Sequence, residues 1–423
     1  MNLKRKLEDS LPFYNSLVKP VHLFRAVVAG VKCKFPARGL KVIGVTGTNG
    51  KTSTCFYIWK MLNESHRKAG IMTTVAWGVK DLEPELNHMT TVDSRTLNER
   101  IRKIKEAGAE YLVLEVTSHA MEQFRTLGVP IEVAVFTNLT HEHLDYHKTM
   151  ERYARAKAKL FRKAKFGVVN ADDKWAQTFI KASQEYITYG IKNGKLRAKE
   201  VKLGVEGSKY TVYDMNRKEE MVKIQTRIPG EFNVYNSLAA VGVGRRLGLE
   251  EEEIKRGIEA LEGVEGRMTR VDEGQAFTVI VDYAHTPDAL EKVFKAMPEV
   301  KGRVIAVHGG AGRRDESTRE ERGRILGRNA DVVVITEDDS RDEDPEEIAE
   351  DFVRGAEKAG KKLGKDLVVD LNREEAIRGA IRLAKRGDLV LILGKGHEKT
   401  ILRKEGAEPF EDIKVVRKWL KKR

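Results

Sequence analysis

The sequence predicts an α/β protein of two domains: a central parallel sheet that carries a phosphate-binding loop, and a C-terminal Rossmann-like α/β domain. Three observations support this fold class. The chain has 423 residues, more than one ordinary hydrophobic core accommodates. Apolar runs typical of buried strands alternate with helical patterns in both halves of the chain. Residues 43–62, IGVTGTNGKTSTCFYIWKML, read as a strand, a glycine-rich turn and a helix.

The chain divides into three parts on this pattern. We expect a short N-terminal appendage at 1–39, a central domain at 40–268 and a C-terminal domain at 269–423. In the central domain the strand-like runs lie at 41–45, 111–116, 133–139 and 166–173. Residues from about 184 to 228 are expected to form short antiparallel strands, as an excursion before a helix at 232–248. The C-terminal strand-like runs, each followed by a helical pattern, lie at 277–284, 303–310, 331–339 and 388–396.

The charge composition does not indicate a nucleic-acid partner. Lys and Arg number 77 against 64 Asp and Glu, a net charge of +13. Many of the positive charges stand beside acids, as in EEEIKRGIEA and EEIAEDFVRGAEKAGKK, and such mixed patterns are typical of solvated helix faces. A basic surface still attracts anionic substrates or anionic lipid. We expect no nucleic acid among the partners, and a monomer.

Cysteine content and hydropathy favour a cytoplasmic protein. Cys33 and Cys55 are the only cysteines, so no disulfide framework or structural zinc site is indicated. No apolar run reaches membrane-spanning length, and the first residues, MNLKRKLEDS, lack the apolar core of a signal peptide. Residues 11–35 are apolar, aromatic and punctuated by Lys and Arg. Such a segment either lies on a membrane surface or packs against the neighbouring domain, and packing is favoured.

The turn at 47–52 has the composition of a phosphate-binding loop. Gly47 and Gly50 let backbone N–H groups approach phosphate, Lys51 can reach the outer phosphates, and Thr52 can ligate Mg²⁺. The strict P-loop spacing would place a glycine where Val45 stands. The turn is therefore a variant loop that predicts nucleotide binding, with a merely structural glycine-rich turn as the alternative.

A second polar cluster, EVTSHAMEQFR at 115–125, follows the strand at 111–116. Glu115 stands at a strand's carboxyl end, where α/β proteins place ligand groups, and its carboxylate can hold Mg²⁺. A lone glutamate at this position is more often a cap or an ion-pair partner. His119, Gln123 and Arg125 follow at once and can donate hydrogen bonds to an anionic substrate, which favours a functional site.

A third cluster, TNLTHEHLDYH at 137–147, places three histidines beside acids at the end of another strand. A lone histidine is usually structural, and a histidine/acid cluster can also indicate zinc. This cluster shares its expected sheet edge with the phosphate loop, so Mg²⁺ is favoured over Zn²⁺.

The ordered set of motifs resembles the Mur ligase family, and most closely its MurE type. The resemblance covers residues 40 to about 412 and rests on TGTNGKT, EVTSHAMEQFR, FTNLTHEHLDYH, YARAKAKLF, NADD, GEFNVYNSLAA, GVEGRM, DYAHTPDAL and LGKGHE. It implies an ATP-dependent amide-bond ligase of cell-wall (peptidoglycan) biosynthesis. ATP phosphorylates a carboxylate, an amine attacks the acyl phosphate, and ADP and phosphate leave. Mg²⁺, with two ions expected, would neutralise the charge crowded by phosphoryl transfer.

The resemblance assigns roles residue by residue. The catalytic set is Lys51, Lys157, Glu115 and His143, and the metal set is Thr52, Glu115, His143 and Lys157, the last as a carbamate. The ATP-binding set is Gly47, Thr48, Asn49, Gly50, Lys51, Thr52, Asn138, Asn233, Asn236, Arg267 and Asp282. Arg267 and Asp282 span the domain junction, so closure of the C-terminal domain would assemble the site.

Two further sets concern the other substrates. The peptide acceptor would contact Thr90, Thr91, Thr117, Gln123 and Arg125. The incoming amino acid would contact Arg314, Asp338, Asp339, Arg341, Gly394 and Glu398. The meso-diaminopimelate type of the family carries Asp-Asn-Pro-Arg where this chain has DDSR at 338–341. The arginine that forks onto a distal carboxylate is kept, whereas the extra acid favours an amine over a carboxylate. The resemblance therefore favours meso-diaminopimelate over L-lysine by a small margin only, with other diamino acids open.

The chain also departs from the family at its start. Family members carry an N-terminal domain of roughly a hundred residues that holds the uridine moiety, and here only about 40 residues precede the first strand. The acceptor could therefore be UDP-linked, carried by a lipid, or a pseudomurein-type precursor. A folylpolyglutamate or poly-amino-acid ligase is disfavoured by EVTSHAMEQFR and LGKGHE, and a catalytically dead nucleotide-binding scaffold by the intact catalytic set.

Overall fold

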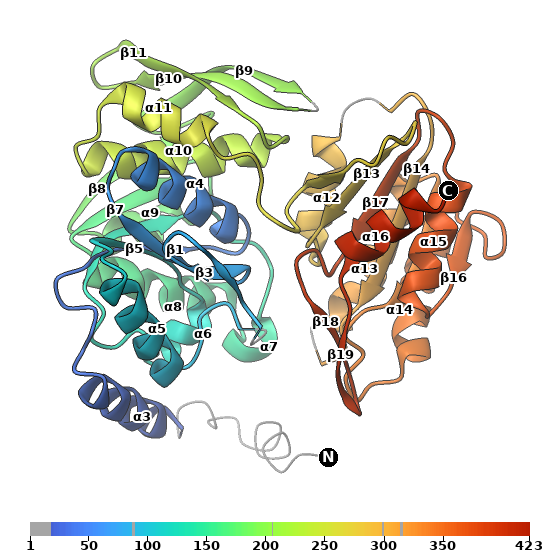
Figure 1. Ribbon diagram of the computed structural model, residues 1–423, viewed down its shortest axis with the longest axis horizontal. Coiled ribbons are helices and arrows are strands. Elements are labelled where there is room, and N and C mark those ends of the chain that lie inside the picture. Colours follow the sequence, from blue (N-terminus) through green and yellow to red (C-terminus); the bar gives the residue numbers. More distant parts are fainter. Residues whose placement is uncertain (1–17, 87–88, 205, 298–299, 314–315) are drawn as a thin grey trace.

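The computed structural model describes residues 18–86, 89–204, 206–297, 300–313 and 316–423. The chain forms two α/β halves that face each other across a cleft, with the N-terminal part of the sequence in one and the C-terminal part in the other (Figure 1). The predicted residue numbers of the domain boundaries stay a prediction.

The larger half is built on an 11-stranded sheet. Its strands are β1 (Lys41–Thr46), β2 (Ala69–Met72), β3 (Ala76–Gly78), β4 (Glu83–Pro84), β5 (Tyr111–Glu115), β6 (Ile131–Phe136), β7 (Phe166–Asn170), β8 (Glu185–Gly190), β9 (Leu196–Gly204), β10 (Gly207–Asp214) and β11 (Glu219–Thr226). Its helices are α3 (Lys19–Lys32), α4 (Lys51–Glu64), α5 (Ser94–Glu106), α6 (Ser118–Glu122), α7 (Leu144–His147), α8 (Met150–Lys163), α9 (Ala176–Ala182), α10 (Glu231–Arg246) and α11 (Glu251–Glu259).

Helices cover both faces of this sheet, which explains the continuous apolar runs of its strands. Ile43 and Val45 of β1 point into the core that contains α4 and α10, whereas Val42 points into the core that contains α5 and α8. The strand order around the centre is β6-β1-β5, all parallel. The loops that follow these three strands therefore meet at one edge of the sheet, and they contain the three polar clusters of the sequence.

The smaller half contains a six-stranded sheet in the order β12-β13-β17-β14-β15-β16. Its strands, with the separate hairpin β18–β19, are β12 (Thr269–Val271), β13 (Thr278–Asp282), β14 (Val304–Gly310), β15 (Val332–Glu337), β16 (Leu367–Val369), β17 (Leu389–Leu393), β18 (Thr400–Arg403) and β19 (Gly406–Pro409). Its helices are α12 (Pro287–Ala296), the 3₁₀ helix η1 (Glu316–Thr318), α13 (Arg319–Asn329), α14 (Pro345–Lys358), α15 (Arg373–Leu383) and α16 (Asp412–Lys421). The predicted α/β fold class is confirmed in both halves.

One expectation about strand direction was wrong. The first strand of the 184–228 segment, β8, pairs parallel with β7, and only β9, β10 and β11 are antiparallel to one another. All four strands extend the central sheet instead of forming a separate excursion. The sequence pattern predicted that this segment forms strands, but it did not predict which strands pair. Pairing depends on which edge of the folded sheet is available to the next strand.

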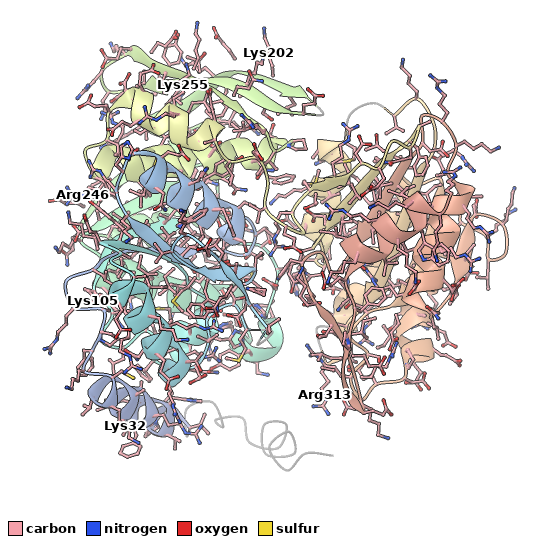
Figure 2. All side chains as sticks on the ribbon, in the orientation of Figure 1. Lys32, Lys105, Lys202, Arg246, Lys255 and Arg313 are labelled. Atoms are coloured by element: carbon pink, nitrogen blue, oxygen red, sulfur yellow. The ribbon has the colours of Figure 1, made fainter. Side chains whose placement is uncertain are left out.

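The surface is rich in charged side chains, and Lys32, Lys105, Lys202 and Arg246 extend outward from the larger half (Figure 2). Many charges pair across helices, as where Lys358 Nζ of α14 lies 2.8 Å from Glu320 Oε1 of α13. Among the described residues, no helix combines the length and the apolar character needed to cross a bilayer.

Candidate functional site in the cleft between the two halves

The glycine-rich turn joins β1 to α4 and is held by the loop that follows β6. Thr48 N–H donates to Asn138 O at 2.8 Å, and Asn49 N–H donates to Asn138 Oδ1 at 3.0 Å. Thr137 Oγ1 donates to Asn49 O at 2.7 Å. Gly47 is packed so closely that a Cβ there would lie 1.9 Å from Thr137 Oγ1. The turn is therefore a rigid cradle that opens α4 with its backbone N–H groups, the arrangement that binds phosphate.

Gly50 ends this turn in the left-handed region, with φ of 81°, and rests on a group of buried asparagines. Asn236 Oδ1 accepts a hydrogen bond from Thr54 Oγ1 at 3.3 Å, and Asn236 Nδ2 donates to Asn233 Oδ1 at 3.0 Å. A Cβ on Gly50 would lie 2.4 Å from Asn236 Oδ1.

We expect Gly50→Ala to weaken ATP binding at least about tenfold, or about 1.4 kcal/mol, because the methyl group forces the turn away from Asn236 and strains a left-handed φ. Isothermal titration with ATP and Mg²⁺ measures this loss. Gly248→Ala is the matched control, because Gly248 has φ of 70° and no atom within 4 Å of its ideal Cβ. Equal ATP affinity in the Gly50 variant and the wild type would contradict the assignment of this turn to phosphate.

Glu115 is buried at the end of β5, directly beside the start of α4. Its Oε2 accepts hydrogen bonds from Thr52 Oγ1 at 3.0 Å and from Thr74 N and Oγ1, both at 3.1 Å. Its Oε1 lies 4.0 Å from Lys51 Nζ, which donates to Thr48 O at 2.8 Å. A threonine hydroxyl and a carboxylate at the phosphate cradle are oxygen ligands of the kind Mg²⁺ prefers.

Lys157 lies on the buried face of α8, with 2% of its surface exposed. Its Nζ donates to Gly47 O at 2.6 Å and lies 4.6 Å from the centre of the Tyr153 ring. Burial, with the nearby positive charge of Lys51, holds the pKa of Lys157 well below its usual value, although Glu142 and Glu115 act against this shift. The Lys157 amine is therefore held directly beneath the glycine-rich turn, in surroundings that disfavour its charged form.

His143 immediately precedes α7, with a positive φ of 57°, and lies beside other imidazole and phenol rings. The centre of its ring lies 4.8 Å from that of His119, which in turn lies 5.5 Å from that of His147. Burial lowers the pKa of His119 to about 3 and that of His147 to about 4. Those two imidazoles are therefore neutral near pH 7, so they add little positive charge beside the residues predicted to bind metal.

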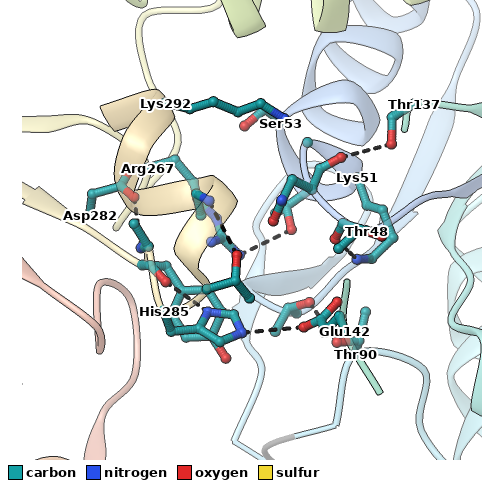
Figure 3. A pocket seen from close by; sticks show the side chains of 18 of the residues that line it. Thr48, Lys51, Ser53, Thr90, Thr137, Glu142, Arg267, Asp282, His285 and Lys292 are labelled. Carbon is teal, nitrogen blue, oxygen red and sulfur yellow. Dashed lines mark hydrogen bonds and ion pairs between the residues drawn. The ribbon is translucent and has the colours of Figure 1, made fainter. Parts of the chain in front are cut away.

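Contacts between the two halves close the cleft around this region (Figure 3). Arg267 lies in the segment between α11 and β12 that joins the halves, and its Nη2 donates to Thr52 Oγ1 at 3.3 Å. Asn49 Nδ2 of the phosphate turn donates to Asp288 Oδ2 of α12 at 2.7 Å. Asp282 does not contact the turn directly: its carboxylate accepts hydrogen bonds from the backbone N–H groups of Met268 and Ala284, and burial raises its pKa.

A second contact between the halves involves a histidine that the sequence reading did not select. His285 Nε2 lies 3.5 Å from Glu142 Oε1, and His143 Nε2 lies 3.7 Å from the same oxygen. Burial would raise the pKa of Glu142, but the adjacent His143, His285 and Lys51 outweigh it and hold that pKa well below the usual range. His285 and Asp288 both stand in DYAHTPDAL, so the motif was recognised while its role in joining the halves was missed.

The predicted acceptor residues gather beside Glu115. Thr91 Oγ1 donates to Glu115 O at 2.9 Å and accepts from Thr117 N–H at 3.0 Å. Arg125 donates to Thr91 O and, through Nη2, to Gln123 Oε1 at 2.6 Å. Thr90 Oγ1 lies 3.0 Å from Thr74 Oγ1. The structure thus brings this set together, with Gln123 orienting Arg125.

The predicted amino-acid residues lie at the carboxyl ends of β15 and β17, around a lysine that sequence reasoning missed. Lys395 Nζ, fully buried, lies 2.8 Å from Asp339 Oδ1, 2.8 Å from Glu398 Oε2 and 3.3 Å from Asp338 Oδ1. Burial would lower the pKa of Lys395, but attraction to these carboxylates raises it above its usual value. The ammonium faces three carboxylates, so the cluster keeps a net negative charge.

The residues predicted to bind the amino acid also include two arginines and a glycine. Arg341 has φ of 57°, and its Nη1 donates to Gly312 O at 3.1 Å. Arg314 lies outside the described residues. Gly394 leaves no room for a side chain, because a Cβ there would lie 2.9 Å from Asp338 Oδ2.

A single cleft of about 980 Å³ joins the glycine-rich turn, the predicted acceptor residues beside Glu115 and the acidic cluster around Lys395. Of the predicted residues, it is lined by Thr48, Asn49, Gly50, Lys51, Thr52, Thr90, Thr91, Glu115, Thr117, Arg125, Asn138, His143, Asn236, Arg267, Asp282, Asp338, Asp339, Gly394 and Glu398. The described residues of the predicted set that do not line it are Gly47, Asn233, Gln123, Lys157 and Arg341. A phosphate cradle, a carboxylate and imidazole set, and an acidic pocket thus share one space.

Comparison with known proteins gives a consistent result. Residues 45–244 match the Mur ligase middle domain, and residues 266–396 match the Mur ligase, glutamate ligase domain. The UDP-N-acetylmuramoyl-L-alanyl-D-glutamate--2,6-diaminopimelate ligase of Syntrophomonas wolfei is 39% identical over 394 residues, covering 91% of this chain and 79% of that protein. The UDP-N-acetylmuramyl-tripeptide synthetase of a Roseiflexus species is 38% identical, covering 91% and 79%. A solved 2,6-diaminopimelate ligase structure superposes with a TM-score of 0.62 at 32% identity, covering 91% of this chain and 79% of that one.

Proposed function

This chain belongs to the Mur ligase family, and we propose that it adds meso-diaminopimelate to the peptide of a UDP-N-acetylmuramoyl-L-alanyl-D-glutamate acceptor with consumption of ATP. Relatives that match over nine-tenths of this chain are named for that reaction. The observation that carries the proposal is the single cleft. It joins a phosphate cradle to an acidic pocket, so a phosphorylated carboxylate and an amine can meet within it.

The residues of the larger half serve the activation step. The turn at 47–50 and Lys51 hold the ATP phosphates, and Arg267 reaches them from the segment that joins the halves, through its position beside Thr52. The acceptor carboxylate attacks the γ-phosphorus, the bond to the β,γ-bridging oxygen breaks, and ADP leaves. The acceptor is oriented by Arg125 and the threonines around Glu115, so its carboxylate lies on the phosphate side of the cleft.

Mur ligases use Mg²⁺, and the oxygen and nitrogen donors here fit it: Thr52, Glu115, His143 and Lys157 as a carbamate would hold it, two ions in our proposal. When bound, Mg²⁺ neutralises the negative charge that phosphoryl transfer concentrates. Support for the carbamate comes from the burial of Lys157, which favours the uncharged amine, and only an unprotonated amine reacts with CO₂.

The residues of the smaller half serve the second step. Asp338, Asp339 and Glu398 outnumber the one ammonium of Lys395, so an amino acid with a second amino group is attracted. Asp339 further accepts from Leu402 N–H at 3.0 Å. Lysine carries that second amino group too, but only a diamino acid with a distal carboxylate can also pair with Arg341. We therefore propose meso-diaminopimelate, with Arg341 at its distal carboxylate. Its amino group attacks the acyl carbon, and phosphate leaves.

We expect ADP release only when acceptor and amino acid are supplied together, and faster with meso-diaminopimelate than with L-lysine or L-ornithine. A coupled ADP assay with UDP-N-acetylmuramoyl-L-alanyl-D-glutamate measures both results. Release of ADP without either substrate would contradict the mechanism, and silence with every amino acid would favour another carrier for the acceptor or an inactive scaffold. The monomeric state and the cytoplasmic location remain predictions.

A further inference from the structure

Helix α3 carries an unusual concentration of exposed apolar side chains. Of the twelve large hydrophobic residues exposed in the described part of the chain, five lie on this one helix. Phe24 is 68% exposed and Val31 60% exposed, and the remaining three are Val21, Leu23 and Val27. Scattered single apolar residues are normal at a surface, whereas a contiguous group marks an interaction site.

Helix α3 differs from an ordinary surface helix in that it buries small residues and exposes large apolar ones. Its buried residues are the small Ala26, Ala29 and Gly30, and a Cβ on Gly30 would lie 2.4 Å from the Phe35 ring. At 100° per residue, positions 24, 27 and 31 fall on one side of the helix and 26, 29 and 30 on the other. A surface helix normally buries its large apolar side chains, so the outer face of α3 is suited to a second apolar phase.

Cations lie along one flank of that outer face and beyond the C-terminal end of α3. Arg25 and Lys32 are exposed on α3 itself, and Lys34, Arg38 and Lys105 are exposed close by. Lys105 Nζ donates to Arg38 O at 2.6 Å, which ties the end of α5 to the segment after α3, and Lys32 and Lys105 both extend outward there (Figure 2). Within the described ranges of the chain, no carboxylate lies at ion-pair distance from any of these five groups.

We propose that the outer face of α3 docks the protein on an anionic phospholipid bilayer. Large apolar side chains enter the acyl boundary while Lys and Arg at the flanks meet the phosphate headgroups, which is how interfacial amphipathic helices bind. Charge complementarity selects this occupant, because an apolar face flanked by these cations attracts anionic headgroups and repels a second copy of itself.

The docked face is linked to the acceptor side of the cleft. Lys19 Nζ, at the start of α3, lies 2.8 Å from Glu122 Oε2 at the end of α6. The Phe35 ring also packs against Gly128, three residues after Arg125, where a Cβ would lie 2.5 Å from it. Docking through α3 would therefore hold the acceptor-binding end of the larger half near the membrane.

Vesicle flotation tests this with the full-length chain. We expect binding to vesicles of phosphatidylglycerol and phosphatidylcholine, weakening as salt is raised, and little binding to phosphatidylcholine alone. The double substitution Phe24→Glu/Val31→Glu should reduce the bound fraction at least about tenfold, and Arg25→Glu/Lys32→Glu should abolish the preference for anionic lipid. Leu363→Glu, at a site 58% exposed, and Lys202→Glu/Lys209→Glu are the matched controls and should bind as the wild type does.

Other occupants of the face give distinct results. Equal binding to both vesicle types, or unchanged binding by the Phe24/Val31 variant, would overturn the proposal. The proposal would also be overturned if the wild type sediments as a dimer and does not bind vesicles, while the Phe24/Val31 variant is a monomer. That result would mean that a second copy of the chain covers α3. Binding that appears only after removal of residues 1–17 would assign the face to that segment. ADP release without vesicles should be unchanged in all these variants, which separates docking from catalysis.

Discussion

Replacing Lys157 with alanine is expected to reduce ligase turnover at least about a thousandfold. The side chain ends beneath the phosphate turn, with Nζ 2.6 Å from Gly47 O, and no other lysine Nζ of the described chain contacts that carbonyl. As a carbamate it would supply an anionic oxygen pair for Mg²⁺ that alanine cannot replace. The coupled ADP assay measures the loss, and circular dichroism checks that the variant is folded.

The carbamate can be observed independently of activity. We expect a ¹³C carbamate signal in wild-type protein equilibrated with ¹³C-bicarbonate, and its absence in Lys157→Ala. Lowering the pH through the depressed pKa of Lys157 protonates the amine, so the signal and the activity should fall together in acid. Lys159→Ala is the matched control on the same helix, because Lys159 pairs with Glu122 at the surface. Full activity in the Lys157 variant would refute this role.

Replacing Lys395 with methionine is expected to destabilise the protein by about 3–5 kcal/mol, because it leaves Asp338, Asp339 and Glu398 close together without their buried cation. Urea unfolding measures this change. The KM for the amino acid should rise as well, since the same carboxylates line the cleft. The pKa of Lys395 is raised in the folded state, so its stabilising charge is fully present below the usual lysine pKa and is lost only as the pH rises through the raised value.

A second substitution separates charge from packing in this cluster. Adding Asp339→Asn to the Lys395 variant removes one of the uncompensated charges and should recover part of the stability. Lys418→Met is the control, because Lys418 is 47% exposed in its side chain and pairs with Glu374 at the surface, where a pair is worth less than about 1 kcal/mol. If the Lys395 and Lys418 variants lose equal stability, the buried cluster does not have the assigned energetic role.

The fold class followed from the sequence because central parallel strands are buried on both faces. β1 and β5 are apolar almost throughout for that reason. Because strands alternate with helical patterns along the chain, few sheet topologies were compatible with the sequence. The direction of β8 and the hairpin β18–β19 could not be read in the same way. Short or exposed strands carry weak patterns, and their partners are chosen by edges that exist only after the sheet has formed.

Candidate site residues could be selected from the sequence where a residue type is unusual for its position in the strand and helix pattern. Glycines before Lys51, and Glu115 and His143 at strand ends, indicate a ligand even in a single sequence. Lys395 gave no such signal, because lysine is a common surface residue and only the tertiary structure shows that its ammonium is buried among acids. The contact between His285 and Glu142 was hidden as well, since the two residues belong to different halves.

The sequence by itself determined that this protein is a two-part α/β Mur ligase with its phosphate loop after the first strand of the sheet, because local periodicity and ordered motifs are written in neighbouring residues. Only the tertiary structure decided which side of α3 is exposed, that the Lys157 amine is buried beneath the glycine-rich turn, and that the acidic pocket opens into the same cleft. Each of these depends on burial and on contacts between residues far apart in the chain. No local pattern of residues encodes such contacts.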